Sequence, residues 1–517
     1  MTDYHPATVA QHTPRKRAMV MADLGQATDY RQLVDQSNRL AHAFADAGLR
    51  EGDTVAFLLE NSCAYPELMW AAKNSGMRYV CISTHLTADD AAYIVRDSGA
   101  RMLVASFGLR DLAGQAAALL DNGPALFMIG GSEPPFRDLD AIARECSAQP
   151  LQGQRRRGPS MLYSSGTTGR PKGVRTSIPD APPHEPPQRF AMLQKQYGLG
   201  PDTVFLNPGP FYHAGPNRFM MSVLRAGGTV IGLSRFSPEA TLRAIEEHGV
   251  THGFFVPTMF SRMLALPDDI RNAVDTKSLR HAIHAAAPCP VPLKQAMIDW
   301  WGPVIDELYA GTEAFGHTFI TSAEWLDHVG SVGRPAKGCR LKIVDEDGRT
   351  LPQGQAGRIM MTNGLKIAYH GDAAKSAALY DEDGYASLGD IGYLDEDGYL
   401  YLTDRESHMI IVGGVNVYPQ EIENALLRHP AVEDAAVIGV PDEDLGERIK
   451  AVIQLHPHVT RDAAVADEIM EFCRHNLSAY NRPHSIDFGD SLPRSPMGKL
   501  LKKQLRERYW SGLDRMI

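Results

Sequence analysis

Residues 161–173 read MLYSSGTTGRPKG, an apolar run that passes directly into a loop of glycines and hydroxyl side chains. Gly166, Gly169 and Gly173 let the backbone approach a ligand closely. The donors that the loop offers to phosphate oxygens, besides its backbone N–H groups, are Ser164, Ser165, Thr167, Thr168 and Lys172. Lys172 precedes Gly173 rather than Ser or Thr, so the loop is not a P-loop. A plain surface linker is the alternative, but linkers rarely carry this density of Thr and Gly after a strand. We expect a phosphate-binding loop.

The segments on either side of this loop alternate helical and strand patterns. Residues 31–49 repeat apolar positions at helical spacing and end at Gly48, and short apolar runs follow at 54–59, 78–83 and 101–106. The same rhythm returns after residue 200, in TVFLNPG, GGTVIGLS and THGFFVP. Such alternation is typical of βαβ units and a largely parallel sheet. We therefore expect an α/β fold with two related α/β subdomains.

The pattern changes near residue 330 to short alternating segments that predict hairpins and a small antiparallel sheet or barrel. The tetrapeptide Asp-Glu-Asp-Gly begins at residues 345, 381 and 395. A calcium loop is disfavoured, because the glycine comes fourth instead of sixth and the required ligands are incomplete. Hairpin turns account for the repeats better.

A compact α+β segment follows Arg405, and we place the domain boundary there, with one domain at 1–404 and another at 405–517. The stretch PDAPPHEPPQ at 179–188 cannot be a helix or a central strand, and we expect an exposed insertion or mobile loop.

Composition excludes several classes of protein. The 517 residues exceed what one core usually organises, and a net charge of −10 argues against a nucleic-acid-binding surface as the main function. No apolar run reaches the roughly 20 residues that span a bilayer. The six scattered cysteines form no C-x-x-C pair and the N-terminus has no apolar signal region, which favours a reducing, cytoplasmic location. We expect a homodimer, because the symmetric dimer is the commonest oligomer of soluble proteins.

Five motifs in order resemble the adenylate-forming superfamily of acyl-CoA synthetases, peptide-synthetase adenylation domains and luciferases. They are YSSGTTGRPKG, YAGTE at 309–313, SLGDIGYLDEDGYLYLTDR, IIVGGVNVYPQEIE and PRSPMGKL. The resemblance spans about residues 29–508 and is strongest to bacterial ligases of fatty, bile-acid, steroid or aryl acids. It implies that the 1–404 region is a large N-terminal domain of three subdomains and that 405–517 is a small mobile lid.

In that family a carboxylate attacks the α-phosphorus of ATP to give an acyl-adenylate, and the thiol of coenzyme A then displaces AMP. The resemblance assigns Thr312 and Glu313 to the α-phosphate and Mg²⁺, with Glu313 as metal ligand. It assigns Tyr309 to adenine, although a core tyrosine is the alternative, and Asp390 and Arg405 to the ribose. ATP, Mg²⁺ and coenzyme A are thus the implied cofactors, and a carboxylic acid is the implied substrate.

The lid residues have roles in the family's two half-reactions. Lys499, after Gly498, matches the lysine that is essential for adenylation. Gly413 and Gly414 match a hairpin that the rotated lid presents to the pantetheine tunnel. The hinge falls at Ser407, followed by His408, where relatives carry other residues, so the pivot is not fixed by the motif.

His213 matches a histidine near the junction of the acyl pocket and the tunnel. A carboxylate nucleophile is already ionised at pH 7 and needs no base, so we expect His213 to position or gate rather than to deprotonate.

The acyl-pocket walls expected from family positions are Phe211, Asn217, Phe219, Met220, Phe255, Val256, Pro257, Thr258, Ala285 to Ala287, Phe315 and Gly316. The set is apolar and holds no Arg or Lys, which disfavours a dicarboxylic substrate. The alanines leave room for a bulky chain or ring.

The leading interpretation is therefore an AMP-forming acid–CoA ligase for a fatty or ring-bearing acid. A ligase that loads a carrier protein is the alternative, since both acceptors present the same pantetheine arm. A non-catalytic nucleotide-binding protein is disfavoured by the complete set of motif residues.

Overall fold

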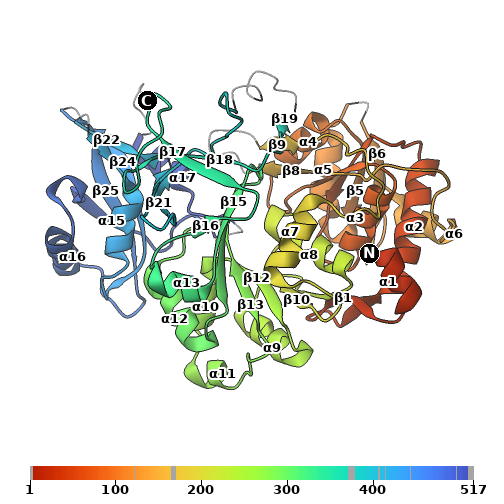
Figure 1. Ribbon diagram of the computed structural model, residues 1–517, viewed down its shortest axis with the longest axis horizontal. Coiled ribbons are helices and arrows are strands. Elements are labelled where there is room, and N and C mark those ends of the chain that lie inside the picture. The colour runs from red at the N-terminus through yellow and green to blue at the C-terminus, as the bar shows by residue number, and fades with distance from the viewer. Residues whose placement is uncertain are drawn as a thin grey trace.

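The computed structural model describes residues 4–121, 123–164, 171–370, 376, 379–405, 408–413, 415–442, 444–495 and 498–510. In Figure 1 the N-terminal α/β elements occupy one end of an elongated body, the C-terminal elements occupy the other end, and residues of the middle of the chain lie between them.

The first sheet contains the apolar runs of the N-terminal region. Its order is β19(Ala368–Tyr369), β9(Lys172–Arg175), β8(Ser160–Ser164), β4(Arg78–Cys81), β3(Thr54–Leu58), β5(Ala100–Ser106), β6(Ala125–Ile129) and β7(Arg137–Asp138). Strands β8, β4, β3, β5 and β6 run parallel, whereas β8 and β9 form an antiparallel hairpin. The helices of this region are α2(Tyr30–Asp46), α3(Ala64–Asn74), α4(Ala88–Asp97), α5(Arg110–Ala118) and α6(Leu139–Glu145). Helix α2 ends before Gly48, whose φ of +90° stops it.

The second sheet continues the α/β pattern. Its order is β16(Arg334–Pro335), β15(His317–Ile320), β14(Ile305–Ala310), β13(His281–His284), β12(His252–Phe255), β10(Val204–Asn207), β11(Thr229–Gly232), β1(Arg17–Met21) and β2(Gln26–Asp29). The helices that accompany it are α1(Pro6–His12), α7(Gln188–Tyr197), α8(Ala214–Ala226), α9(Pro238–His248), α10(Pro257–Leu264), α11(Asp268–Asn272), α12(Val291–Trp301) and α13(Ser322–Asp327). The prediction of two α/β subdomains is confirmed.

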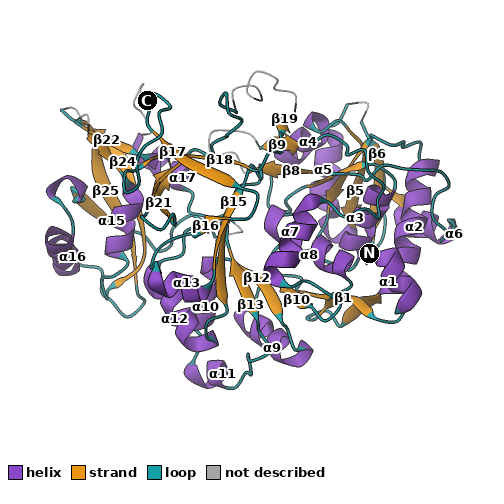
Figure 2. Cartoon of the chain, viewed as in Figure 1, coloured by secondary structure: helices purple, strands orange, loops and turns teal. Residues whose placement is uncertain are grey.

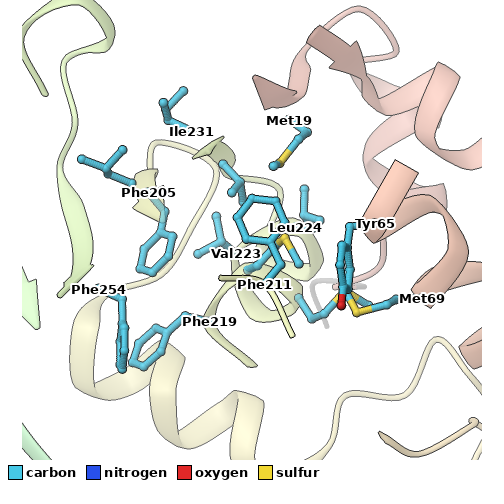
Figure 3. Close-up of a cluster of buried hydrophobic side chains, with 14 of the residues drawn as sticks. Met19, Tyr65, Met69, Phe205, Phe211, Phe219, Val223, Leu224, Ile231 and Phe254 are labelled. Atoms are coloured by element: carbon cyan, nitrogen blue, oxygen red, sulfur yellow. The ribbon is translucent and has the colours of Figure 1, made fainter. Parts of the chain in front are cut away.

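One hydrophobic core joins the two subdomains. Tyr65 and Met69 of α3 pack beside Phe211 and the buried residues of α8, as Figure 3 shows. The rings of Tyr65 and Phe211 lie 5.8 Å apart in an edge-to-face contact. Because residues from both sheets share this core, the two subdomains form one rigid base for a site between them.

The third subdomain is a small antiparallel sheet with the order β17(Arg340–Val344), β18(Gly357–Thr362), β20(Asp390–Leu394) and β21(Leu400–Arg405). The three Asp-Glu-Asp-Gly sequences form tight turns, as predicted. In the third of them, Gly398 donates its N–H to the carbonyl of Asp395 and has a φ of +80°.

The C-terminal elements form a separate sheet of β23(Val415–Val417), β22(Ile410–Val412), β25(Gly446–Leu455) and β24(Val432–Asp442), with β26(Ser485–Phe488) paired to β25. Its helices are α15(Pro419–Leu426), α16(Ala463–Asn476) and α17(Lys502–Trp510), and Figure 2 shows them beside the sheet. The change of sheet falls between Arg405 and Ile410. The boundary at 404/405 remains a prediction.

The proline-rich stretch is irregular up to the start of α7 at Gln188, as its composition requires. Its carbonyls are tied to the body of the protein, because Arg225 of α8 donates to the carbonyls of Pro183 and His184. No helix in the described part of the chain is long and apolar enough to cross a membrane.

Candidate active site

A cavity of about 870 Å³ lies where the two α/β subdomains, the small antiparallel sheet and the C-terminal elements meet. We call it the active-site cavity. Ala285 to Ala287 follow the end of β13, and Thr312 and Glu313 follow the end of β14, so the cavity lies at the carboxyl ends of parallel strands. Ligands of open α/β sheets bind at this edge. Asp390, Arg405 and Lys499 enter the same cavity from the other two sheets.

Three of the predicted residues form one hydrogen-bonded group. Asp390 and Arg405 are register partners on β20 and β21, and Arg405 Nε lies 3.0 Å from Asp390 Oδ1. The Tyr309 hydroxyl donates to Asp390 Oδ2 across 2.6 Å. Burial raises the pKa of Tyr309, and the Asp390 charge adds to the effect, so the phenol stays a donor. Asp390 is buried beside the Arg405 guanidinium, which suits an acceptor of two hydroxyl groups.

Thr312 and Glu313 lie in the turn after β14 and both line the cavity. Arg218 of α8 holds this turn, because its Nη2 donates to the carbonyl of Thr312 across 2.7 Å. A carboxylate of this kind fits Mg²⁺, which prefers one carboxylate together with phosphates and waters. Glu313 is thus the residue here that would hold the ion.

Lys499 reaches the cavity from a tight loop of the C-terminal domain. Its N–H donates to Ser495 Oγ across 3.1 Å, and Arg494 donates to the carbonyl of Gly498 across 2.6 Å. The pKa of the Lys499 ammonium is lowered to about 8. Burial is the main cause and the Arg405 charge adds to it, whereas the charges of Asp390 and Glu313 partly offset the shift. The structure therefore places the Lys499 side chain in the cavity that Asp390 and Glu313 also line.

The phosphate-binding loop predicted from the sequence is described only at its base. Ser164 and Lys172 are register partners on β8 and β9, and Lys172 lines the cavity. Ser165, Gly166, Thr167, Thr168 and Gly169 lie outside the described residues.

His213 precedes the first turn of α8 and lines the cavity. Burial lowers the pKa of its imidazole to about 4, and the charge of His85 contributes. His213 is therefore neutral at pH 7. Its Nε2 is buried without a hydrogen-bond partner among the described residues, so a ligand group can bond to it.

Of the residues described in the predicted hairpin and hinge, His408 lines the cavity and Gly413 does not. Gly413 lies between β22 and β23 with a φ of +56° and donates its N–H to the carbonyl of Leu445. Gly414 and Ser407 fall outside the described residues. His408 Nδ1 lies 3.5 Å from Asp404 Oδ1. The C-terminal elements thus bring Lys499 to the cavity, whereas Gly413 is not part of its lining.

The predicted acyl walls are partly wrong. Phe219, Ala285 to Ala287 and Gly316 line the cavity, whereas the following do not: Phe211, Asn217, Met220, Phe255, Val256, Pro257, Thr258 and Phe315. Successive strand residues point to opposite faces, so Phe254 faces the cavity while Phe255 packs on Phe260 and Trp301.

The predicted wall set holds no Arg or Lys, whereas the cavity lining contains two arginines on this side. Arg218, one residue beyond the predicted Asn217, faces the cavity, and α7 contributes Arg189, Met192 and Leu193. Helix α7 was not predicted, because it directly follows the proline-rich stretch. The periodic Phe190, Leu193 and Tyr197 are the signal that could have identified this helix.

A buried ion pair that the motifs do not include supports the cavity floor. Lys294 Nζ of α12 lies 2.7 Å from Glu307 Oε2 of β14, and both residues are buried. Glu307 lines the cavity two residues before Tyr309. Burial raises the pKa of Glu307, and the Lys294 charge opposes the shift.

Two family models match the chain. The model described as AMP-binding enzyme matches residues 7–365, and the model described as AMP-binding enzyme C-terminal domain matches residues 421–499.

Individual proteins are similar over nearly the whole chain. A fatty acid–[acyl-carrier-protein] ligase from Streptomyces coeruleorubidus is 32% identical and covers 100% of this chain and 97% of its own. A feruloyl-CoA synthase from an Amycolatopsis species is 32% identical and covers 94% of each chain. Among solved structures, the o-succinylbenzoate CoA synthetase of Bacillus subtilis with its acyl-adenylate intermediate has a TM-score of 0.80, with 27% identity and 98% of each chain covered.

Proposed function

The chain belongs to the family of AMP-binding enzymes, and from that membership we propose that it joins a carboxylic acid with an apolar body to coenzyme A. It is an AMP-forming acid–thiol ligase of the adenylate-forming superfamily, and ATP, Mg²⁺ and coenzyme A are its cofactors. The observation that carries the proposal is the seating of Lys499 in one cavity with Thr312, Glu313, Asp390 and Arg405.

In the first half-reaction a carboxylate oxygen of the acid attacks the α-phosphorus of ATP. The bond from that phosphorus to the bridging oxygen breaks, and pyrophosphate leaves with the electron pair. Lys499 supports this step by placing its positive charge where negative charge gathers. Asp390 and Arg405 would hold the ribose, and Tyr309 would pack on the adenine. Mg²⁺, held by Glu313, would neutralise phosphate charge.

In the second half-reaction the thiol sulfur of coenzyme A attacks the carbonyl carbon of the acyl-adenylate. The bond between that carbon and the phosphate oxygen breaks, AMP leaves, and the thiol proton passes to solvent. We propose that neutral His213 positions the reacting carbonyl and that the Gly413–Gly414 hairpin serves this step after the lid rotates.

Carrier-protein loading is the second candidate acceptor. One relative is named as a fatty acid–[acyl-carrier-protein] ligase and another as a feruloyl-CoA synthase. The names therefore support both a carrier protein and coenzyme A as acceptor, and they include both a fatty and an aryl acid. A cytoplasmic location and a homodimer stay predictions.

The test is pyrophosphate release from ATP over a panel of fatty, aryl and steroid acids, followed by AMP release with coenzyme A or a pantetheinylated carrier protein. We expect release with at least one acid and transfer to coenzyme A. Transfer to the carrier alone would reject coenzyme A as acceptor, and the absence of release with every acid would reject the ligase.

A further inference from the structure

Two arginines face the cavity from the helices that form its apolar wall. Arg189 comes from the first turn of α7 and Arg218 from the second turn of α8. Their neighbours in the lining include Met192, Leu193 and Phe219, which come from the same two helices. Arg189 therefore lies in the apolar part of the cavity wall, and Arg218 joins this part to the Thr312 turn.

The positive charge of these arginines is not compensated within the acyl wall. Arg189 has neither a hydrogen bond nor an ion pair with any residue that the structure describes, although it is partly buried. Arg218 donates to a backbone carbonyl, and its Nε is buried without a partner in the described part of the chain. The carboxylate that acts on Arg218 is Glu313, which the proposed function reserves for Mg²⁺.

A third polar group points to the same place. His317 of β15 lines the cavity, and its Nε2 is buried without a partner among the described residues. Burial lowers the pKa of His317 to about 4, and the charge of Arg189 contributes, so the imidazole is neutral at pH 7. Buried polar groups are normally bonded, so unbonded donors beside a ligand cavity indicate a ligand that bonds to them.

We propose that the acid carries a second carboxylate besides the reacting one, and that Arg189 and Arg218 bind it. A guanidinium presents two parallel N–H groups that match a carboxylate, and such a pair is stronger and more specific than a neutral hydrogen bond. The substrate class is thus a dicarboxylic acid with an apolar middle, which contacts Met192 and Phe219. This inference rests on the proposed function, because it concerns the acyl end of the same site.

The test compares matched acids on the full-length enzyme. Pyrophosphate release is measured with hexanoate, octanoate and decanoate and with the dicarboxylates adipate, suberate and sebacate. We expect kcat/KM for the preferred dicarboxylate to exceed that of its monocarboxylic partner by about tenfold or more, which corresponds to one charge-assisted contact.

The variants Arg189→Gln and Arg218→Gln separate charge from shape. Arg189→Gln is expected to raise KM for the dicarboxylate about tenfold to a hundredfold and to leave KM for ATP and for the monocarboxylate unchanged. Arg218→Gln is expected to raise KM for the dicarboxylate as well, but it also frees the Thr312 carbonyl, so activity with ATP and with both acids should fall in this variant and Arg189→Gln is the diagnostic one. Arg262→Gln, an exposed arginine of α10, is the matched control and is expected to change neither acid.

Preference for the monocarboxylate, an equal loss for both acids in Arg189→Gln, or a rise in KM for ATP alone would overturn the inference while the ligase function stands. Ligand-induced thermal stabilisation by the dicarboxylates, with AMP present, gives a readout without turnover. Stabilisation of the wild type but not of Arg189→Gln supports the inference even if no acid releases pyrophosphate, and equal stabilisation of both, or of neither, contradicts it.

Discussion

Gly498 of the C-terminal domain lies against Thr258 of α10, so closely that a Cβ on Gly498 would stand 2.6 Å from Thr258 Cγ2 and 3.0 Å from its Cβ. The φ of Gly498 is +72°, which L side chains rarely adopt. The close contact with Thr258 and the positive φ both occur at the residue directly before Lys499. The glycine is therefore what lets the lysine loop seat on the N-terminal domain with its ammonium in the cavity.

Gly498→Ala is expected to slow adenylation by about tenfold or more, because a methyl group and a strained φ both oppose the seated loop. The second half-reaction, measured with a supplied acyl-adenylate and coenzyme A, should keep its rate, since we propose that the lid rotates away from this contact before that step. Adding Thr258→Ala, which removes the hydroxyl and methyl groups, is expected to restore part of the loss. Adenylation at the wild-type rate in Gly498→Ala would show that the contact does not control the step.

Lys499→Ala is expected to reduce adenylation by about a hundredfold or more, since the cation that faces the phosphate site is lost. Thioesterification of a supplied acyl-adenylate should change by no more than about fivefold. Lys503→Ala, an exposed lysine of α17, is the control and should alter neither step. Equal losses in both half-reactions would contradict the assignment.

The pH dependence of adenylation should reflect the titration of the Lys499 ammonium. Its pKa is lowered to about 8, so the cationic form dominates below that pH and disappears above it. We expect kcat/KM for adenylation to fall as the pH rises through about 8. Lys499→Arg keeps its charge at high pH and should lose this alkaline limb, even if its rate is lower. An unchanged limb in Lys499→Arg would assign it to another group.

The local features of this fold could be predicted from the sequence, because they depend on neighbouring residues. The spacing of apolar residues in 31–49 gives α2, and the glycines of the Asp-Glu-Asp-Gly sequences give the turns. The grouping of Tyr309, Asp390 and Arg405 was accessible only through the resemblance. These residues lie far apart in the chain, and no local pattern places them at one strand pair.

The composition of the acyl wall could not be predicted at the same level. It depends on which face of a strand or helix points inward, so an error of one position exchanges Phe255 for Phe254 or Asn217 for Arg218. Arg189 is harder still. Its position depends on how α7 packs after an irregular stretch, which the sequence pattern does not specify.

The ribose site predicts two graded losses. Asp390→Asn removes a carboxylate that accepts from Tyr309 and pairs with Arg405, so the affinity for AMP should fall about tenfold to a hundredfold. Tyr309→Phe removes one hydrogen bond and keeps the ring, and should cost only about 1 kcal/mol of AMP binding. Calorimetric titration with AMP measures both. Wild-type affinity in Asp390→Asn would remove this residue from the nucleotide site.

The buried ion pair between Lys294 and Glu307 should stabilise the fold, whichever substrate the enzyme uses. Lys294→Met should leave the Glu307 carboxylate buried and unpaired and lower the free energy of unfolding by about 3–5 kcal/mol. Adding Glu307→Gln should recover most of the loss, because the buried charge is then gone.

The pKa of Glu307 is already raised by burial and should rise further without Lys294. A group with a raised pKa in the folded state loses its stabilising contribution as the pH rises through that pKa, so Lys294→Met should be less destabilised at pH 5 than at pH 8. Urea unfolding at both pH values measures the effect, and an equal loss at the two, or no recovery in the double variant, would contradict the role of the pair.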